Sequence, residues 1–161
     1  AYLNRKATQA EAYNVLSGGQ GLRSSYAERV AIEKHAEERV LDELDRLGWR
    51  GSQSPGKTES FDLVVKKQGR RLLVEVKGTS SRCGSTVFLT AAERRLAERA
   101  EDNLLLAVVS GIRLERRTPK PRASGGQLMF YWPSSLQDDQ FEAIAYRVSL
   151  DGEKSVDPES I

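Results

Sequence analysis

Apolar residues in the first part of the chain recur at helical spacing. Ser25 and Glu28 make a capping box, and Gly48 fits the position just past the end of a helix. Between them the apolar side chains form one stripe, at Val30, Ala36, Val40, Leu41, Leu44 and Leu47. The pattern predicts an amphipathic helix from about Ser25 to Leu47 with that stripe buried.

Beyond this helix, short apolar runs separated by turn residues predict strands. Gly51–Lys57 is rich in serine, proline and glycine and predicts a loop. Phe61–Val65 and Arg71–Val76 predict two strands, joined by a turn at Lys66–Arg70 that contains Gly69. The two strands should pair as an antiparallel hairpin.

The second half of the chain predicts one more helix and several strands. Thr90 and Glu93 make a second capping box, which predicts a helix to about Ala100. Asn103–Ser110 is almost wholly apolar, as expected for a central strand buried on both faces. The remaining predictions are a loop at Gly78–Gly84, a brief strand at Thr86–Leu89, an exposed loop at Arg113–Gly126, and strands at Leu128–Trp132 and Ala145–Leu150.

This order of elements predicts an α/β domain with a mixed central β-sheet flanked by helices. The 161 residues fit one domain, which we place at residues 25–150. Residues 1–24 are interpreted as an N-terminal extension or linker with a hinge at Ser17–Gly21, and residues 151–161 as a polar tail. The opening Ala1-Tyr2-Leu3 indicates a fragment of a longer protein.

Composition then excludes several classes of protein. Cys83 is the only cysteine and His35 the only histidine, which excludes a disulfide framework and the usual Cys/His zinc sites. A Ser-His-Asp triad would need His35, which lies in a charged helical stretch. No apolar run is long enough to cross a bilayer and no signal peptide is visible, so we expect a cytoplasmic protein without a membrane partner. Any metal would be bound by oxygen ligands, which favours Mg²⁺ or Mn²⁺.

Candidate catalytic residues gather on the predicted hairpin. Glu75 and Lys77 are two residues apart in its second strand, so they share one face while Val74 and Val76 point the other way into the core. Asp62 lies at the start of the first strand, across from the end of the second. Pairing of the two strands would place the carboxylate of Asp62 next to that of Glu75.

Two neighbouring carboxylates repel each other and require a cation. A divalent metal held by Asp62, Glu75 and the backbone carbonyl of Val76 would supply it. Lys77 would then orient or help to deprotonate an attacking water, or stabilise charge on a phosphate. Together these parts suit phosphodiester hydrolysis. Acid-x-base triplets on strand edges are common, so an ordinary charged strand edge is the alternative.

Glu33 is a fourth candidate, as a catalytic residue and a metal ligand. It stands three residues before Ala36 and seven before Val40, on the stripe that faces the sheet. A metal site, reached directly or through water, would explain a carboxylate there. The alternative is a solvated Glu33 at the edge of the stripe.

Basic and hydroxyl side chains are candidates for nucleic-acid contacts, although the net charge is only +2. These candidates are Lys66, Arg70, Arg71, Thr79, Ser80, Arg113, Arg116 and Arg117. Solvated surface is the alternative for the basic residues, and capping of a turn is the favoured role for the hydroxyls from Thr79 to Ser81. Glu93 is interpreted as a cap residue rather than a ligand.

In this order the motifs resemble a known family. Leu72–Thr79 (LLVEVKGT) looks like the signature of PD-(D/E)XK, or restriction-endonuclease-like, nucleases, and more narrowly like the domain family named after the plant protein NO VEIN. Further motifs of that family are matched by Ile32-Glu33 with Ala36, Gly48-Trp49, Phe61-Asp62 and Val87–Glu93. The resemblance covers roughly Glu28 to Ser110. It implies a restriction-endonuclease-like fold with a four-stranded mixed sheet, Asp62, Glu75 and Lys77 in the core catalytic positions, and Glu33 in the helix position.

The leading hypothesis is a Mg²⁺-dependent endonuclease domain of a restriction or defence protein that cuts double-stranded DNA. The resemblance also implies fusion to other domains, such as helicases or methyltransferases, and action as a homodimer, because one site cuts one strand. Two alternatives stay open. The first is a nucleic-acid-binding module that does not cut, and the second is a protein-interaction domain in a larger assembly.

Overall fold

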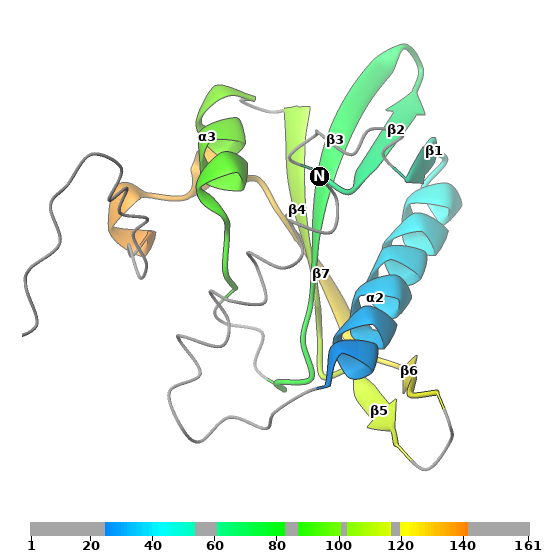
Figure 1. Cartoon of the computed structure of the whole chain (residues 1–161). Coiled ribbons are helices and arrows are strands. Elements are labelled where there is room, and N and C mark those ends of the chain that lie inside the picture. The colour runs from blue at the N-terminus through cyan, green and yellow to red at the C-terminus, as the bar shows by residue number, and fades with distance from the viewer. Residues whose placement is uncertain (1–24, 54–60, 83–86, 101–102, 117–119, 142–161) are drawn as a thin grey trace, which may run out of the picture.

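The structure is a computed structural model that describes residues 25–53, 61–82, 87–100, 103–116 and 120–141. The predictions for residues 1–24, the strand Ala145–Leu150 and the tail at 151–161 lie outside these ranges. The described part has three layers, with helix α2 (Tyr26–Arg46) on one face of a sheet and helix α3 (Ala91–Arg99) on the other (Figure 1). This confirms the predicted α/β fold with a mixed sheet between helices.

The described main sheet has five strands in the order β1-β2-β3-β4-β7. Their bounds are Arg50–Gln53, Leu63–Lys67, Arg70–Gly78, Leu104–Ser110 and Gln127–Tyr131. β3 and β4 run parallel, whereas the other neighbouring pairs are antiparallel. Every residue of β4 is buried, as its continuous apolar sequence predicted.

Helix α2 begins and ends where its sequence predicted. The Ser25 hydroxyl accepts a hydrogen bond from the N–H of Glu28, whose carboxylate accepts one from the N–H of Ser25. Gly48 follows the helix with a φ of +83°. The buried stripe runs at intervals of four through Ile32, Ala36, Val40 and Leu44. Val30 and Leu47 were wrongly placed in it: Val30 is out of step with this spacing, Leu47 follows the last helical residue, and both are exposed.

The predicted hairpin is confirmed as β2 and β3, with a tighter turn than expected. Its strands pair from Leu63 opposite Val74 to Lys67 opposite Arg70. The turn therefore holds only Gln68 and Gly69, which have φ values of +47° and +79°. Positive φ at both positions gives the turn a twist that matches the twist of the strands.

Strand β1 corrects the predicted loop at Gly51–Lys57, of which residues 54–57 lie outside the described ranges. Arg50–Gln53 pairs with β2 along its whole length. A Cβ atom on Gly51 would lie 2.2 Å from the carbonyl oxygen of Val64, so this strand needs glycine for the close approach of the two backbones. A serine- and glycine-rich composition therefore concealed an edge strand.

The predicted loop at Arg113–Gly126 is also wrong, because it contains strands β5 (Arg113–Glu115) and β6 (Arg122–Ser124), which pair with each other. Leu114 and Ala123 point inward onto the core, while their neighbours on the strands are exposed. One inward apolar residue per strand is too short an alternation to recognise in a polar sequence. The brief strand predicted at Thr86–Leu89 is absent over the described residues 87–89.

The chain after β7 forms two short 3-10 helices, η2 (Pro133–Ser135) and η3 (Asp138–Gln140). No helix within the described ranges is long and apolar enough to cross a membrane.

Candidate active site

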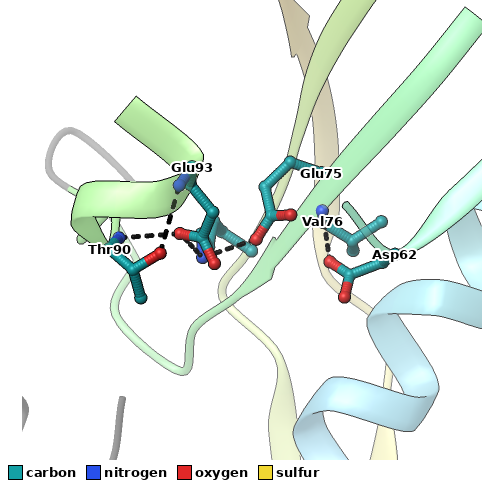
Figure 2. Close-up of polar contacts among 6 residues, drawn as sticks. Asp62, Glu75, Val76, Thr90 and Glu93 are labelled. Atoms are coloured by element: carbon teal, nitrogen blue, oxygen red, sulfur yellow. Dashed lines mark hydrogen bonds and ion pairs between the residues drawn. The ribbon is translucent and has the colours of Figure 1, made fainter. Parts of the chain in front are cut away.

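Asp62 is locked to the neighbouring strand just before β2 begins. Its backbone N–H donates to the carbonyl of Val74 at 2.9 Å, and its Oδ2 accepts from the N–H of Val76 at 2.9 Å (Figure 2). The hairpin register thus turns the Asp62 carboxylate onto β3, one residue from Glu75. The prediction placed this carboxylate beside that of Glu75; the structure places it on the backbone N–H of Val76, close enough for its charge to raise the pKa of Glu75.

Glu75 and Lys77 project from the face of β3 that α3 covers, whereas Val74 packs in the core beneath α2. The Lys77 ammonium Nζ lies 2.7 Å from Glu75 Oε1 and 2.9 Å from Glu93 Oε2. The three side chains are 12%, 3% and 2% exposed, respectively. One lysine is therefore shared by two carboxylates inside the protein.

Glu93 enters this cluster from the first turn of α3. The N–H of Thr90 donates to Glu93 Oε2 at 2.8 Å, and the N–H of Glu93 donates to the Thr90 hydroxyl at 3.2 Å. The predicted capping role is confirmed, but the ion pair with Lys77 was missed. A signal for it was present, since Glu93 and Ala97 share one helical face and both are buried. The same kind of signal had singled out Glu33.

The electrostatics of the cluster follow from burial and from a surplus of acid. Burial raises the pKa of Glu75 well above its ordinary value, Lys77 opposes this, and the carboxylates of Asp62 and Glu93 raise it further. Burial also raises the pKa of Glu93, but Lys77 and the N–H of Thr90 outweigh it and hold this pKa below its ordinary value. Of the two glutamates that Lys77 contacts, Glu75 therefore has the higher pKa and Glu93 the lower.

Lys77 stays charged in this setting. Burial lowers the pKa of its ammonium, but the attraction of Glu75 and Glu93 is stronger, so the pKa lies above its ordinary value. Glu75 and Glu93 also line a small cavity whose other walls are apolar: Leu89, Ala97, Leu104, Leu106 and Pro133. Those walls keep water from screening the charges.

The oxygen atoms near Asp62 fit a hard divalent cation. The N–H and C=O of one strand residue point to the same side, so the Val76 carbonyl faces the Asp62 side, beyond the start of β2. Two carboxylates and this carbonyl are the donor types that Mg²⁺ and Mn²⁺ take. Among the described residues no three Asp, Glu, His or Cys side chains are grouped to hold a metal. Mg²⁺ commonly uses one or two carboxylates and completes its shell with water and substrate phosphate.

Glu33 is half-buried on α2, one residue after Ile32. A Cβ atom on Gly78 would lie 2.9 Å from Ile32 Cγ2, so this part of α2 packs directly on the end of β3. It does so on the α2 side of the sheet, whereas Glu75 and Lys77 project toward α3. The described residues hold no metal-binding group of three that includes Glu33. Its role as a ligand stays a prediction.

The predicted nucleic-acid residues fall at two ends of the sheet. Lys66, Arg70 and Arg71 are exposed near the tip of the β2–β3 hairpin. From Arg70 to Lys77 the strand runs seven residues, which spans roughly 23 Å. The tip therefore lies far from Glu75 and Lys77, and these basic residues do not border the site.

The remaining candidates lie beyond the other end of β3 and β4. Thr79 and Ser80 come directly after Gly78, and Thr79 Oγ1 accepts from the N–H of Ser81 at 3.1 Å, as the turn role predicted. Arg113 is exposed on β5, whereas Arg116 forms an ion pair with Glu28 of α2. Arg117, the last candidate, lies outside the described residues.

These observations define an α/β domain with a buried acid–lysine cluster at the open end of a hairpin. The chain belongs to the NO VEIN C-terminal domain family, because the family model described as "Protein NO VEIN, C-terminal" matches residues 27–123. The match runs from the start of α2 into β6 and includes Asp62, Glu75, Lys77 and Glu93. No curated protein and no solved structure matches the chain.

Proposed function

We propose that the cluster is the centre of a metal-dependent endonuclease of the PD-(D/E)XK type, which hydrolyses phosphodiester bonds in DNA. The observation that carries the proposal is the meeting of Asp62, Glu75 and Lys77 at the open end of one hairpin, with more buried acid than base. Buried charge of one sign is costly, so a stable protein that keeps it requires a cation or a task for it.

The sequence around the cluster supports the same class of enzyme. Phe61-Asp62 and the run Val74-Glu75-Val76-Lys77-Gly78 resemble the signature of that nuclease superfamily. Gly78 also has a structural reason to be there, because a side chain would collide with α2. The motif is therefore supported at its catalytic and at its packing positions.

Each residue has a distinct task in this proposal. Asp62, Glu75 and the Val76 carbonyl would hold Mg²⁺ or Mn²⁺, which supplies Lewis acidity and lowers the pKa of a bound water. Lys77 would bring its ammonium to the scissile phosphate and stabilise the charge that develops there. The raised pKa of Lys77 favours this electrostatic role over that of a general base, because a base must first lose its proton.

The proposed substrate is double-stranded DNA approaching the end of the sheet where Thr79, Ser80 and Arg113 lie. Hydroxyl and guanidinium groups there suit contacts with phosphate oxygens. One such site cuts one strand, so we propose that a double-strand break needs a homodimer or two encounters. A restriction or defence role, with further fused domains, follows from the family resemblance alone.

Plasmid cleavage tests the proposal. With Mg²⁺ or Mn²⁺, the wild-type chain should convert supercoiled plasmid to nicked or linear DNA, and EDTA should prevent this. Glu75→Gln and Lys77→Ala should each lower the rate by roughly 10²–10⁴-fold. Lys34→Ala, on an exposed part of α2 where the side chain is 72% exposed, is the matched control and should cut like the wild type. Metal-dependent cleavage that survives in both site variants would refute the assignment.

A nucleic-acid-binding or interaction module that does not cut is the second candidate. It is favoured by the enclosure of Lys77, whose side chain is only 12% exposed between two carboxylates. This function predicts DNA binding that does not depend on metal, with no cleavage product on modified or unmodified plasmid.

A further inference from the structure

Glu93 is a buried carboxylate to which the proposed reaction gives no task. Its side chain is 2% exposed, and one oxygen, Oε2, accepts from both the Lys77 ammonium at 2.9 Å and the Thr90 N–H at 2.8 Å. We propose that Glu93 is a positioning residue, which holds the Lys77 ammonium in place when Glu75 turns its charge to a divalent cation. The inference rests on the proposed function and adds a residue to it.

Lys77 needs a second partner because its first partner, Glu75, would also have to bind the cation. In the structure Glu75 Oε1 lies 2.7 Å from the ammonium. A cation bound between Asp62 and Glu75 would draw on the same carboxylate charge and weaken that ion pair. A lysine side chain has a flexible four-carbon stem, so an ammonium with no other partner would leave its position.

Glu93 is placed to meet that need and to stay out of the metal site. Glu75 lies between Glu93 and Asp62 (Figure 2), so the carboxylate of Glu93 is separated by Glu75 from Asp62 and from a cation bound between Asp62 and Glu75. The Thr90 N–H and the first turn of α3 hold it there, where a helix N-terminus favours negative charge. The anchor of Lys77 thus belongs to α3, and the metal ligands belong to the hairpin.

The chain contains a matched control for this role. Glu28 occupies the same third position of a capping box, accepts from its N-cap N–H, and also pairs with a base, Arg116. Arg116 belongs to the segment after β5 and has no contact with Glu75 or Lys77 among the described interactions. Glutamine also suits this position of a capping box, so Glu93→Gln and Glu28→Gln remove a charge while both caps can persist.

The first test needs no metal. Glu75→Gln removes the charge of this side chain and so imitates a Glu75 carboxylate that is neutralised by a bound cation. The Lys77 ammonium protons are followed by NMR through their exchange with water, with the exposed Lys34 as the fast reference. We expect a protected Lys77 signal in the wild type, Glu28→Gln and Glu75→Gln, and its loss in Glu75→Gln/Glu93→Gln. Loss in Glu75→Gln alone, or persistence in the double variant with a folded amide spectrum, would overturn the proposal.

The second test uses cleavage and separates positioning from folding. Glu93→Gln should lower kcat about 10²-fold, the effect expected of a misplaced catalytic group, while the KM for plasmid stays within about twofold of the wild type. Glu28→Gln should leave both constants unchanged. An unchanged kcat in Glu93→Gln, or a loss confined to KM, would contradict the role. If the wild type does not cut DNA at all, the proposed function fails, and the metal-free NMR test still decides the role of Glu93.

Discussion

The capping boxes of α2 and α3 share their local chemistry and differ in what surrounds them. Glu28 caps α2 and pairs with Arg116, and Glu93 caps α3 and pairs with Lys77. The Arg116 side chain is 52% exposed, whereas that of Lys77 is 12% exposed. The same sequence motif therefore ends in an ion pair that water screens at one helix, and in a buried ion pair at the other.

The ratio of acid to base separates the two clusters more sharply than exposure does. Around Glu28 the contacts join one acid to one base. Around Glu93 one lysine serves two acids, and Asp62 adds a third carboxylate nearby. Burial, and after it the carboxylates of Asp62 and Glu93, raise the pKa of Glu75, and a bound cation would offset this repulsion. A surplus of buried acid, and not the capping motif itself, distinguishes the candidate active site.

The largest expected difference between the two clusters comes from removing the base of each one. Lys77→Met leaves Glu75 and Glu93 without their shared partner in an apolar setting, and we expect a loss of about 3–5 kcal/mol in the free energy of unfolding. Arg116→Met leaves one acid, Glu28, whose side chain is 11% exposed and still accepts from the N–H of Ser25, so the denaturation midpoint should fall much less than in Lys77→Met. Urea denaturation in EDTA, followed by circular dichroism, measures both.

The double variant Lys77→Met/Glu75→Gln sharpens this result. It removes one base and one acid together, so part of the lost stability should return. Equal losses in Lys77→Met and Arg116→Met would mean that the two clusters do not differ in burial as the structure describes.

The pH dependence of stability should have opposite signs at the two clusters. Folded Glu75 keeps its proton where the unfolded chain has released it, so this group's contribution to stability is present at low pH and is lost as the pH rises above ~4.3. Glu75→Gln has no proton to lose and should therefore gain stability relative to the wild type as the pH rises from 4 toward 8.

Glu28 should behave in the reverse way. The N–H of Ser25, and then Arg116, hold the pKa of Glu28 below its ordinary value, so its contribution is present above that value and is lost as the pH falls. Glu28→Gln should therefore lose stability relative to the wild type as the pH rises over the same range. Urea midpoints in EDTA at several pH values measure both series, and the same trend in both variants would contradict the two assigned pKa directions.

The sequence was sufficient to predict the hairpin cluster because the relevant contacts are set by local rules. Alternation along a strand places Glu75 and Lys77 on one face, and antiparallel pairing across a turn with Gly69 brings Asp62 to β3. The register itself depends on a two-residue turn that is tighter than the predicted one. Burial of β4 could be predicted for the same reason, since a continuous apolar run suits only a central strand.

The contact between Glu93 and Lys77 was missed because it depends on how α3 packs against β3. A glutamate at the third position of a capping box is already explained by the cap, so its place on the same helical face as Ala97 was not interpreted as a sign of a second partner. Strands β1 and β5 were missed for a related reason. Gly51 and Leu114 are chosen by close packing against neighbouring elements, and neither produces an alternating pattern.

The smallest expected effect comes from removing the N-cap hydroxyl of each helix while the ion pair of its glutamate is kept. Ser25→Ala removes the hydroxyl that accepts from the N–H of Glu28, and Thr90→Ala removes the hydroxyl that accepts from the N–H of Glu93 together with a methyl group. Each should cost about 1 kcal/mol in the free energy of unfolding. The Glu93 carboxylate is held by the backbone N–H of Thr90, which alanine keeps. Thr90→Ala should therefore lower the urea midpoint as much as Ser25→Ala does, yet retain the protected Lys77 ammonium signal in NMR. Loss of that signal in Thr90→Ala alone would show that the hydroxyl, and not the backbone, places Glu93 against the lysine.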